Sequence, residues 1–294
     1  MRLNDVEIEN TFAEAFAMKA SKVVITALNE KWAGIAASTV TGFATSVIGC
    51  RCEAGIDYML APEATPDGRP GVLTLFFFMS AKGAADHLAT RIGQAVMTSP
   101  TSACYDGQID GDPISVGGRL RYFGDGFQAS KLLSGRRLWR VPVMDGEFVV
   151  EDVFRLTDAV GGGNFLILAE NQEAGLLAAE AAVAAMTPTP GIILPFPGGV
   201  VRSGSKVGSR YKGQFVSSNT AYCPTLRGLA DSSLPPGVGA VFEIVIDGLD
   251  QGAVARSMAL GIRAACQPGV VRISAGNYGG KLGQFHFRLH EVLA

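Results

Sequence analysis

Residues 239–248 (GAVFEIVIDG) and residues 253–266 (AVARSMALGIRAAC) are the stretch that decides the fold. The first segment is an apolar run, interrupted by Glu243 and closed by an Asp-Gly turn, which is typical of a β-strand. The second carries apolar residues at helical spacing and predicts a helix. The same strand–helix order occurs 168 residues earlier, where residues 71–80 (GVLTLFFFMS) precede the predicted helix 84–97. This repeat indicates an internal duplication.

A second pair of similar segments extends the repeat. Residues 14–29 (EAFAMKASKVVITALN) and 173–187 (EAGLLAAEAAVAAMT) both show helical periodicity. Each is followed by a predicted strand, at 34–40 and at 191–196. The order helix, strand, loop, strand, helix suits a ferredoxin-like, split βαβ layout with helices on one face of an antiparallel sheet. The sequence therefore predicts an α+β protein of two ferredoxin-like α/β sandwich lobes.

The region between the two copies gives the expected division of the chain. Residues 119–123, 137–143 and 147–154 alternate apolar and polar side chains, as short strands do. We place the boundary beside them, with an N-terminal lobe of residues 1–149 and a C-terminal lobe of residues 150–294. Because no Pro/Ser-rich linker separates the lobes, we expect them to be packed together.

Composition limits the class of protein. The chain has 294 residues, of which 37 are Gly; 18% are charged and 48% hydrophobic, with a net charge of −2. Low charge and high apolar content exclude disorder, and the charge balance gives no basic footprint for nucleic acid. The N-terminus, MRLNDVEIE, lacks a signal-peptide pattern and no apolar run is long enough to span a membrane. We expect a soluble, cytoplasmic protein.

The cysteines and histidines favour no metal site. The five Cys are an odd, scattered set, which fits free thiols in a reducing compartment. His286 and His290 are four residues apart, but residues 284–289 alternate like a strand, and no third ligand is evident. We therefore expect no bound metal.

Glu243 is the informative acidic residue. Strand alternation places it on one face with Val241 and Val245. A carboxyl group in apolar surroundings has a raised pKa and can act as a general acid or donate a hydrogen bond to a developing oxyanion. The corresponding residue of the first copy is Leu75, so the acid is specific to the second copy. An exposed Glu or a structural ion pair remains the alternative.

Two Gly-rich loops could bind anionic ligands. They are residues 195–212 (PFPGGVVRSGSKVGSRYK) and 274–283 (SAGNYGGKLG). Gly lets backbone N–H groups approach a ligand closely, and cations can hold phosphate or carboxylate groups. The first loop supplies four cations: Arg202, Lys206, Arg210 and Lys212. Ordinary hairpin turns would explain either loop equally well.

Segments along the whole chain resemble the formylmethanofuran:tetrahydromethanopterin N-formyltransferase family of methanogenic archaea and methylotrophic bacteria. The last of them, ISAGNYGGKLGQ, is the longest and most specific. The matching segments include residues 6–16 (VEIENTFAEAF), 65–72 (TPDGRPGV), 146–152 (GEFVVED), 205–208 (SKVG), 221–225 (AYCPT), 242–249 (FEIVIDGL) and 273–284 (ISAGNYGGKLGQ).

The resemblance implies a fold and an activity. Members of this family have two ferredoxin-like lobes and form homo-oligomers, usually a homotetramer built as a dimer of dimers. They are acyltransferases of one-carbon metabolism that move a formyl group between N-formylmethanofuran and N5 of tetrahydromethanopterin. The two carriers bind together, and no metal or prosthetic group takes part. In bacteria the similar subunit works within a formyltransferase/hydrolase complex.

The resemblance also implies site residues. The key carboxylate of the family aligns with Glu243. The matching loops supply the candidate substrate-binding residues: Ser205, Lys206, Arg210, Tyr222, Asn277 and Lys281. Two other functions stay open, a non-catalytic pterin-binding or structural subunit of such a complex and an acyltransferase with Cys223 as nucleophile. The first would be indicated by loss of Glu243, and the second lacks a His nearby in sequence.

Overall fold

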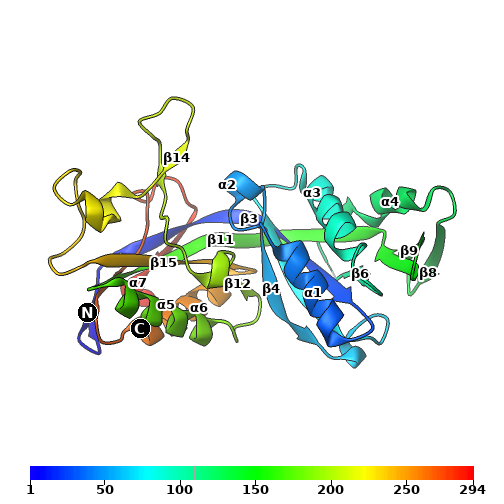
Figure 1. The fold of residues 1–294 in the computed structure, drawn as a ribbon, viewed down its shortest axis with the longest axis horizontal. Coiled ribbons are helices and arrows are strands. Elements are labelled where there is room, and N and C mark those ends of the chain that lie inside the picture. The colour runs from blue at the N-terminus through cyan, green and yellow to red at the C-terminus, as the bar shows by residue number, and fades with distance from the viewer. Residues whose placement is uncertain (109) are drawn as a thin grey trace. The chain divides into compact units, whose positions relative to one another are not determined.

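The computed structural model describes residues 1–108 and 110–294 and divides into two compact units (Figure 1). One unit combines Met1–Phe16 with Val160–Ala294, and the other is Ala17–Ala159. In the first of these units β2 (Val6–Ile8) pairs in parallel with β16 (Val270–Ser274). The N-terminal residues therefore belong to the same sheet as the C-terminal part of the chain.

The Ala17–Ala159 unit is an α+β layer structure. Its sheet has the order β4–β5–β3–β6–β10–β9–β8, antiparallel except for the parallel pair β6 and β10. Its elements are β3 (Phe12–Thr26, which begins in the other unit), α1 (Glu30–Thr41), α2 (Val47–Cys50), β4 (Glu53–Leu60), β5 (Gly71–Phe78), α3 (Ala84–Arg91), β6 (Ala103–Asp106), β7 (Asp112–Ser115), α4 (Gly117–Leu120), β8 (Ala129–Leu133), β9 (Arg136–Val143) and β10 (Gly146–Glu151).

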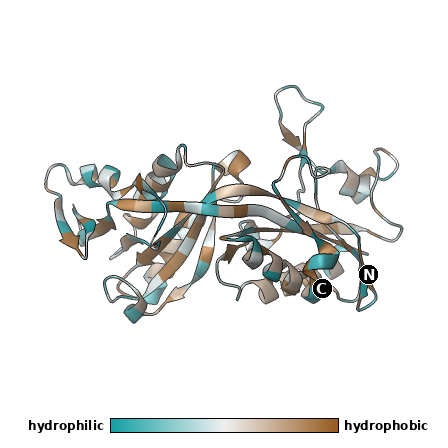
Figure 2. Cartoon of the chain, turned by 180° about the vertical axis from the view of Figure 1, so that it is seen from behind, coloured by the Kyte–Doolittle hydropathy of each residue, from teal (hydrophilic) through white to brown (hydrophobic). Residues whose placement is uncertain are grey.

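The core of this unit lies between the sheet and helices α1 and α3. Phe76 and Val23 from the strands pack with the alanines of α1 and with Leu88 of α3, all of them buried. Figure 2 shows apolar stretches along the strands that carry this core. After Arg91 the helix continues as a π-helical turn, Ile92–Val96.

The unit formed by Met1–Phe16 and Val160–Ala294 has a sheet of order β12–β15–β11–β16–β2–β1. Helices α5 and α6 cover one face, with Phe165, Ile167 and Ile244 of the strands buried against them. Its remaining elements are β1 (Arg2–Leu3), β11 (Val153–Ala169, which begins in the other unit), α5 (Gln172–Met186), β12 (Ile192–Ile193), β13 (Lys206–Val207), β14 (Val216–Ser217), β15 (Ala240–Gly248), α6 (Gln251–Ala265), β17 (Phe285–Arg288) and α7 (Leu289–Val292).

The predicted duplication is present in the order of elements. Strand, helix, strand and helix follow one another as β3, α1, β5 and α3, and again as β11, α5, β15 and α6. Asn29 caps α1 and Asn171 caps α5, each accepting a hydrogen bond from a backbone N–H of the first turn. The α+β class and the predictions for β5, β15, α3, α5 and α6 are confirmed. Nowhere in the part of the chain described here is a helix long and apolar enough to cross a membrane.

Three predicted elements are wrong. Residues 14–29, predicted as a helix, form most of β3, and the predicted strand 34–40 lies inside α1. β3 is a central strand between β5 and β6, so most side chains on both of its faces are buried and the strand shows no simple alternation. In α1 the buried alanines Ala33, Ala36 and Ala37 follow helical spacing. The counterpart of α5 is therefore α1.

The third wrong element is the predicted strand at residues 119–123. These residues belong to α4 and to the 3-10 turn Arg121–Gly124 that follows it. Gly117, at the start of α4, packs closely against the backbone of Glu151, where a side chain would clash.

Candidate active site

Glu243 is held in the middle of β15 by backbone hydrogen bonds on both sides. On one side β15 pairs with β11, where Leu166 lies opposite Glu243. On the other, the N–H of Glu243 donates to the carbonyl of Val201 at 2.9 Å and the N–H of Val201 donates back at 2.8 Å. Because Ile244 is buried against α5 and α6, the Glu243 side chain lies on the opposite face of the sheet, as predicted.

This face carries a pocket that combines apolar and polar side chains. Its empty space, counted together with the open solvent at its mouth, is about 330 Å³. Leu166 and Val241 of the sheet lie in the same apolar cluster as Tyr222. The lining comprises Leu166, Val201, Arg202, Ser203, Gly204, Asn219, Tyr222, Cys223, Val241, Phe242 and Glu243.

The Glu243 carboxyl has no hydrogen bond or ion pair from any of residues 1–108 and 110–294. Burial raises its pKa from the ordinary 4.5 to about 7, because a charged carboxylate is poorly solvated there. A carboxyl group with this pKa is present in both protonation states near neutral pH and can give or take a proton. Because the Glu243 carboxyl has no cationic partner among the described residues, the alternative role of Glu243 in a structural ion pair is not supported.

The loop of residues 195–212 is brought to the pocket only in part. Lys206, in β13, donates from Nζ to Thr220 Oγ1 at 2.8 Å, and Thr220 begins the short turn that ends at Tyr222. Ser205 and Arg210 are exposed and do not line the pocket. The structure thus brings Glu243 and Tyr222 together, and Lys206 of β13 donates a hydrogen bond to the turn that carries Tyr222.

The second predicted loop connects β16 to β17 and is called here the 275–284 loop. Asn277 donates from Nδ2 to Thr11 Oγ1 at 3.2 Å and to the Phe12 carbonyl at 3.1 Å, and it accepts from the N–H of Gly279. Asn277 therefore shapes the loop. Lys281 is exposed.

Comparison with known proteins assigns the family. The model for formylmethanofuran-tetrahydromethanopterin formyltransferase matches residues 1–143, and a second model, described as its proximal lobe, matches residues 146–292. The chain belongs to this family. It is therefore a formyltransferase, and the sequence resemblance is confirmed.

Individual relatives match over the full length. The formylmethanofuran–tetrahydromethanopterin formyltransferase of Methylococcus capsulatus is 57% identical, with 100% of both chains covered. A component of the formyltransferase/hydrolase complex of Methylorubrum extorquens is 52% identical, covering 99% of this chain and 97% of that protein.

Solved structures agree with these matches. The complex from Methylorubrum extorquens, determined with methylofuran, contains a chain with a TM-score of 0.97 and 52% identity, covering 100% of this chain and 99% of that one. The formyltransferase from Methanosarcina barkeri gives a TM-score of 0.92 at 44% identity, covering 99% and 100%.

Sequence reasoning missed two residues that shape the site of this formyltransferase. Asn164 of β11 accepts the N–H of Gly276 at 2.6 Å and donates to the Gly276 carbonyl at 3.2 Å. Tyr278 lies close enough to Glu243 that the negative charge there raises the tyrosine pKa, after the larger effect of burial. A polar Asn directly before the apolar run FLILA was the available signal for Asn164.

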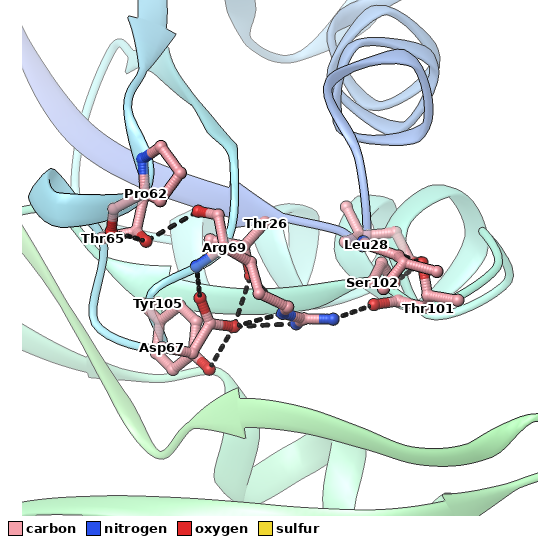
Figure 3. A network of polar contacts seen from close by, with 10 residues as sticks. Thr26, Leu28, Pro62, Thr65, Asp67, Arg69, Thr101, Ser102 and Tyr105 are labelled. Carbon is pink, nitrogen blue, oxygen red and sulfur yellow. Dashed lines mark hydrogen bonds and ion pairs between the residues drawn. The ribbon is translucent and has the colours of Figure 1, made fainter.

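A separate polar network stabilises the Ala17–Ala159 unit (Figure 3). Asp67 Oδ2 accepts from Thr26 Oγ1 at 2.7 Å, from Tyr105 Oη at 3.1 Å and from Arg69 Nε at 2.9 Å. Burial would raise the pKa of Asp67, but the hydrogen bonds from Thr26 and Arg69 outweigh it and lower the pKa. The network fixes the loop before β5, in the matching segment TPDGRPGV.

Metal ligands are not clustered in the described part of the formyltransferase. No group of three or more His, Cys, Asp or Glu side chains among those residues is placed to hold an ion. His286 lies on β17 beside the Phe12 ring, and His290 Nε2 lies 2.9 Å from the Ile8 carbonyl.

Proposed function

We propose that the chain transfers a formyl group between N-formylmethanofuran and N5 of tetrahydromethanopterin, with both carriers bound at once and Glu243 as the acid. The observation that carries this proposal is the half-buried carboxyl group of Glu243 at an open pocket, which has no partner among the described residues and a pKa of about 7. The family and its relatives support the identity of the two carriers.

The reaction needs one bond made and one broken at the formyl carbon. The amine nitrogen of the acceptor attacks this carbon and forms a C–N bond, which gives a tetrahedral oxyanion. Protonated Glu243 donates to the oxyanion or to the departing nitrogen, and collapse breaks the C–N bond to the donor carrier. The proton of the attacking amine then restores the acid. The transfer as written uses no metal or prosthetic group.

Holding the two carriers in register supplies much of the rate enhancement, because it converts a reaction between separate molecules into one within a complex. We assign binding of the carriers to two groups of residues. The first group is Tyr222, which borders the pocket, and Asn277, which belongs to the loop that carries Tyr278. The second group consists of the polar and cationic side chains Ser205, Lys206, Arg210 and Lys281.

The proposal extends to assembly and location. Tyr211, Phe215 and Phe127 are 78–83% exposed, which supports burial of these rings in a homo-oligomer, a tetramer by the family resemblance. The relative in Methylorubrum extorquens is part of a formyltransferase/hydrolase complex, which supports partner subunits. All five cysteines are free, which supports a reducing, cytoplasmic compartment.

The test is a spectroscopic assay of formyl-tetrahydromethanopterin formation by the purified full chain. We expect turnover by the wild type and a loss on the order of 10²- to 10⁴-fold in Glu243→Gln, because Gln cannot transfer a proton. Glu180→Gln, on the exposed side of α5, is the matched control and keeps full activity.

Two outcomes would contradict the proposal. Near wild-type turnover by Glu243→Gln would remove the acid from the mechanism. A wild-type protein that binds the pterin carrier without turnover would favour the non-catalytic alternative. Insensitivity of turnover to iodoacetamide would exclude Cys223 as a nucleophile.

A further inference from the structure

Glu14 is a buried carboxylate that contacts the 275–284 loop through both its backbone and its side chain. It lies on β3 with 1% of its surface exposed, and its N–H donates to the Gly276 carbonyl at 3.2 Å. Its two carboxylate oxygens accept four backbone hydrogen bonds of 2.5–2.9 Å from this loop. The donors are the N–H groups of Tyr278, Gly280, Leu282 and Gly283.

No cation neutralises Glu14 within the part of the chain that the structure describes. Burying a carboxylate is costly unless hydrogen bonds replace its water. Burial acts to raise the pKa of Glu14, but the four backbone N–H groups outweigh it and lower the pKa to about 2. The carboxylate is therefore charged at neutral pH, and the loop backbone provides its solvation.

The loop must fold tightly to reach Glu14, and its glycines allow this. Gly279 and Gly280 both have a φ of 72°, a conformation that favours Gly. A Cβ at Gly283 would lie 2.7 Å from Glu14 Cγ and would clash with the Ala15 carbonyl. The Gly-Gly-Lys-Leu-Gly sequence is thus fitted to the carboxylate of Glu14.

The same hydrogen bonds locate Tyr278. Its N–H is fixed on Glu14, and its ring packs against Phe16 with centroids 6.2 Å apart. Its phenol group lies within electrostatic reach of both Glu243 and Glu14. Leu166 of β11 pairs with Glu243 on one side and with Ser274, the residue before the loop, on the other. Glu14 therefore acts near Glu243 through the loop and Tyr278.

We propose that Glu14 is a positioning residue for formyl transfer: its carboxylate holds the 275–284 loop closed on β3 and so fixes the position of Tyr278 relative to Glu243. This inference rests on the proposed function of Glu243. It adds a role for a residue that touches neither the reacting atoms nor the pocket lining. A purely structural Glu14 would stabilise the fold without being coupled to Tyr278.

The test is a double-mutant cycle of Glu14→Gln and Tyr278→Phe, read as kcat and KM separately. Gln offers one oxygen to four donors, so we expect kcat/KM to fall on the order of 10²-fold, mostly in kcat. Tyr278→Phe alone is expected to lose about tenfold, and the double variant no more than Glu14→Gln. Glu7→Gln, whose side chain pairs with Arg272 near the surface, is the matched control and stays within about twofold.

Hydrogen exchange separates this inference from the proposed function. Without carriers, Glu14→Gln should speed exchange at the four loop amides bound by Glu14, while Glu7→Gln should not. If the wild type transfers no formyl group, the proposed function fails. Independently of that result, unchanged exchange at the four loop amides in Glu14→Gln would overturn the anchoring of the loop by Glu14. Additive losses in the cycle would overturn the link to Tyr278. If Glu14→Gln does not fold, Glu14→Asp, which keeps the charge but shortens its reach, takes its place in both measurements.

Discussion

The raised pKa of Glu243 predicts a pH-dependent effect of Glu243→Gln on stability. In the folded protein the carboxyl keeps its proton to about pH 7, whereas in the unfolded chain it ionises near 4.5. Below 4.5 both states are protonated and the group makes no difference to folding. As the pH rises from 4.5 through 7, the unfolded chain gains from ionisation and the folded protein does not. The contribution of Glu243 to the free energy of unfolding of the wild type therefore falls over this range.

The magnitude follows from the two pKa values. A change from the ordinary 4.5 to about 7 corresponds to about 3 kcal/mol of destabilisation, complete above pH 7. The pocket is open to solvent, which screens part of this effect, so we expect 2 to ~3 kcal/mol. Gln does not ionise, so Glu243→Gln should be more stable relative to the wild type by this amount at high pH than at low pH.

Urea unfolding measures this difference directly. Free energies of unfolding are compared near pH 4 and near pH 8.5 at one protein concentration, because oligomerisation also affects stability. Glu180→Gln serves as the control, since its side chain is exposed on α5. Parallel pH profiles for the wild type and Glu243→Gln would refute the reasoning, because they would mean that the carboxyl is ordinarily acidic in the fold.

The remaining predictions concern stability elsewhere in the chain. Phe76→Ala removes a fully buried ring and should cost 3 to ~5 kcal/mol in urea unfolding; a cost below about 1 would mean that the core refills. Asp67→Asn removes the charge that binds Arg69, Thr26 and Tyr105 and should cost about 2 kcal/mol by thermal unfolding; an unchanged Tm would contradict the role of the network. Because the pKa of Glu14 is lowered, the stability it contributes is present above about pH 4.5 and is lost as the pH falls through 2. In an acid titration the wild type should lose about 3 kcal/mol of unfolding free energy from this group. An equal loss in Glu14→Gln would exclude Glu14 as its source.

Local patterns were reliable where one face of an element is buried and the other is not. The apolar run with its Asp-Gly turn predicted β15, helical spacing predicted α6, and strand alternation predicted the face on which Glu243 lies. They failed for β3, where most side chains on both faces are buried and the first half is rich in Ala. The pairing of β3 with β5 and β6 overrides the helical periodicity of its residues.

The candidate site divides in the same way. Glu243, Tyr222 and the Gly-rich loops were found from the sequence and the family resemblance. Glu14 was not, because its segment was predicted as a helix and its partners lie more than 260 residues away along the chain.

By itself, the sequence determined the α+β class, the duplication, the family and the acid of the second copy, since these depend on local periodicity and on long matching segments. Only the tertiary structure decided which residues surround that acid. Its pKa depends on desolvation and on the lack of a partner among the residues described, and the closure of the 275–284 loop depends on a carboxylate from the far end of the chain. Both are properties of groups distant in sequence, and folding alone brings them together.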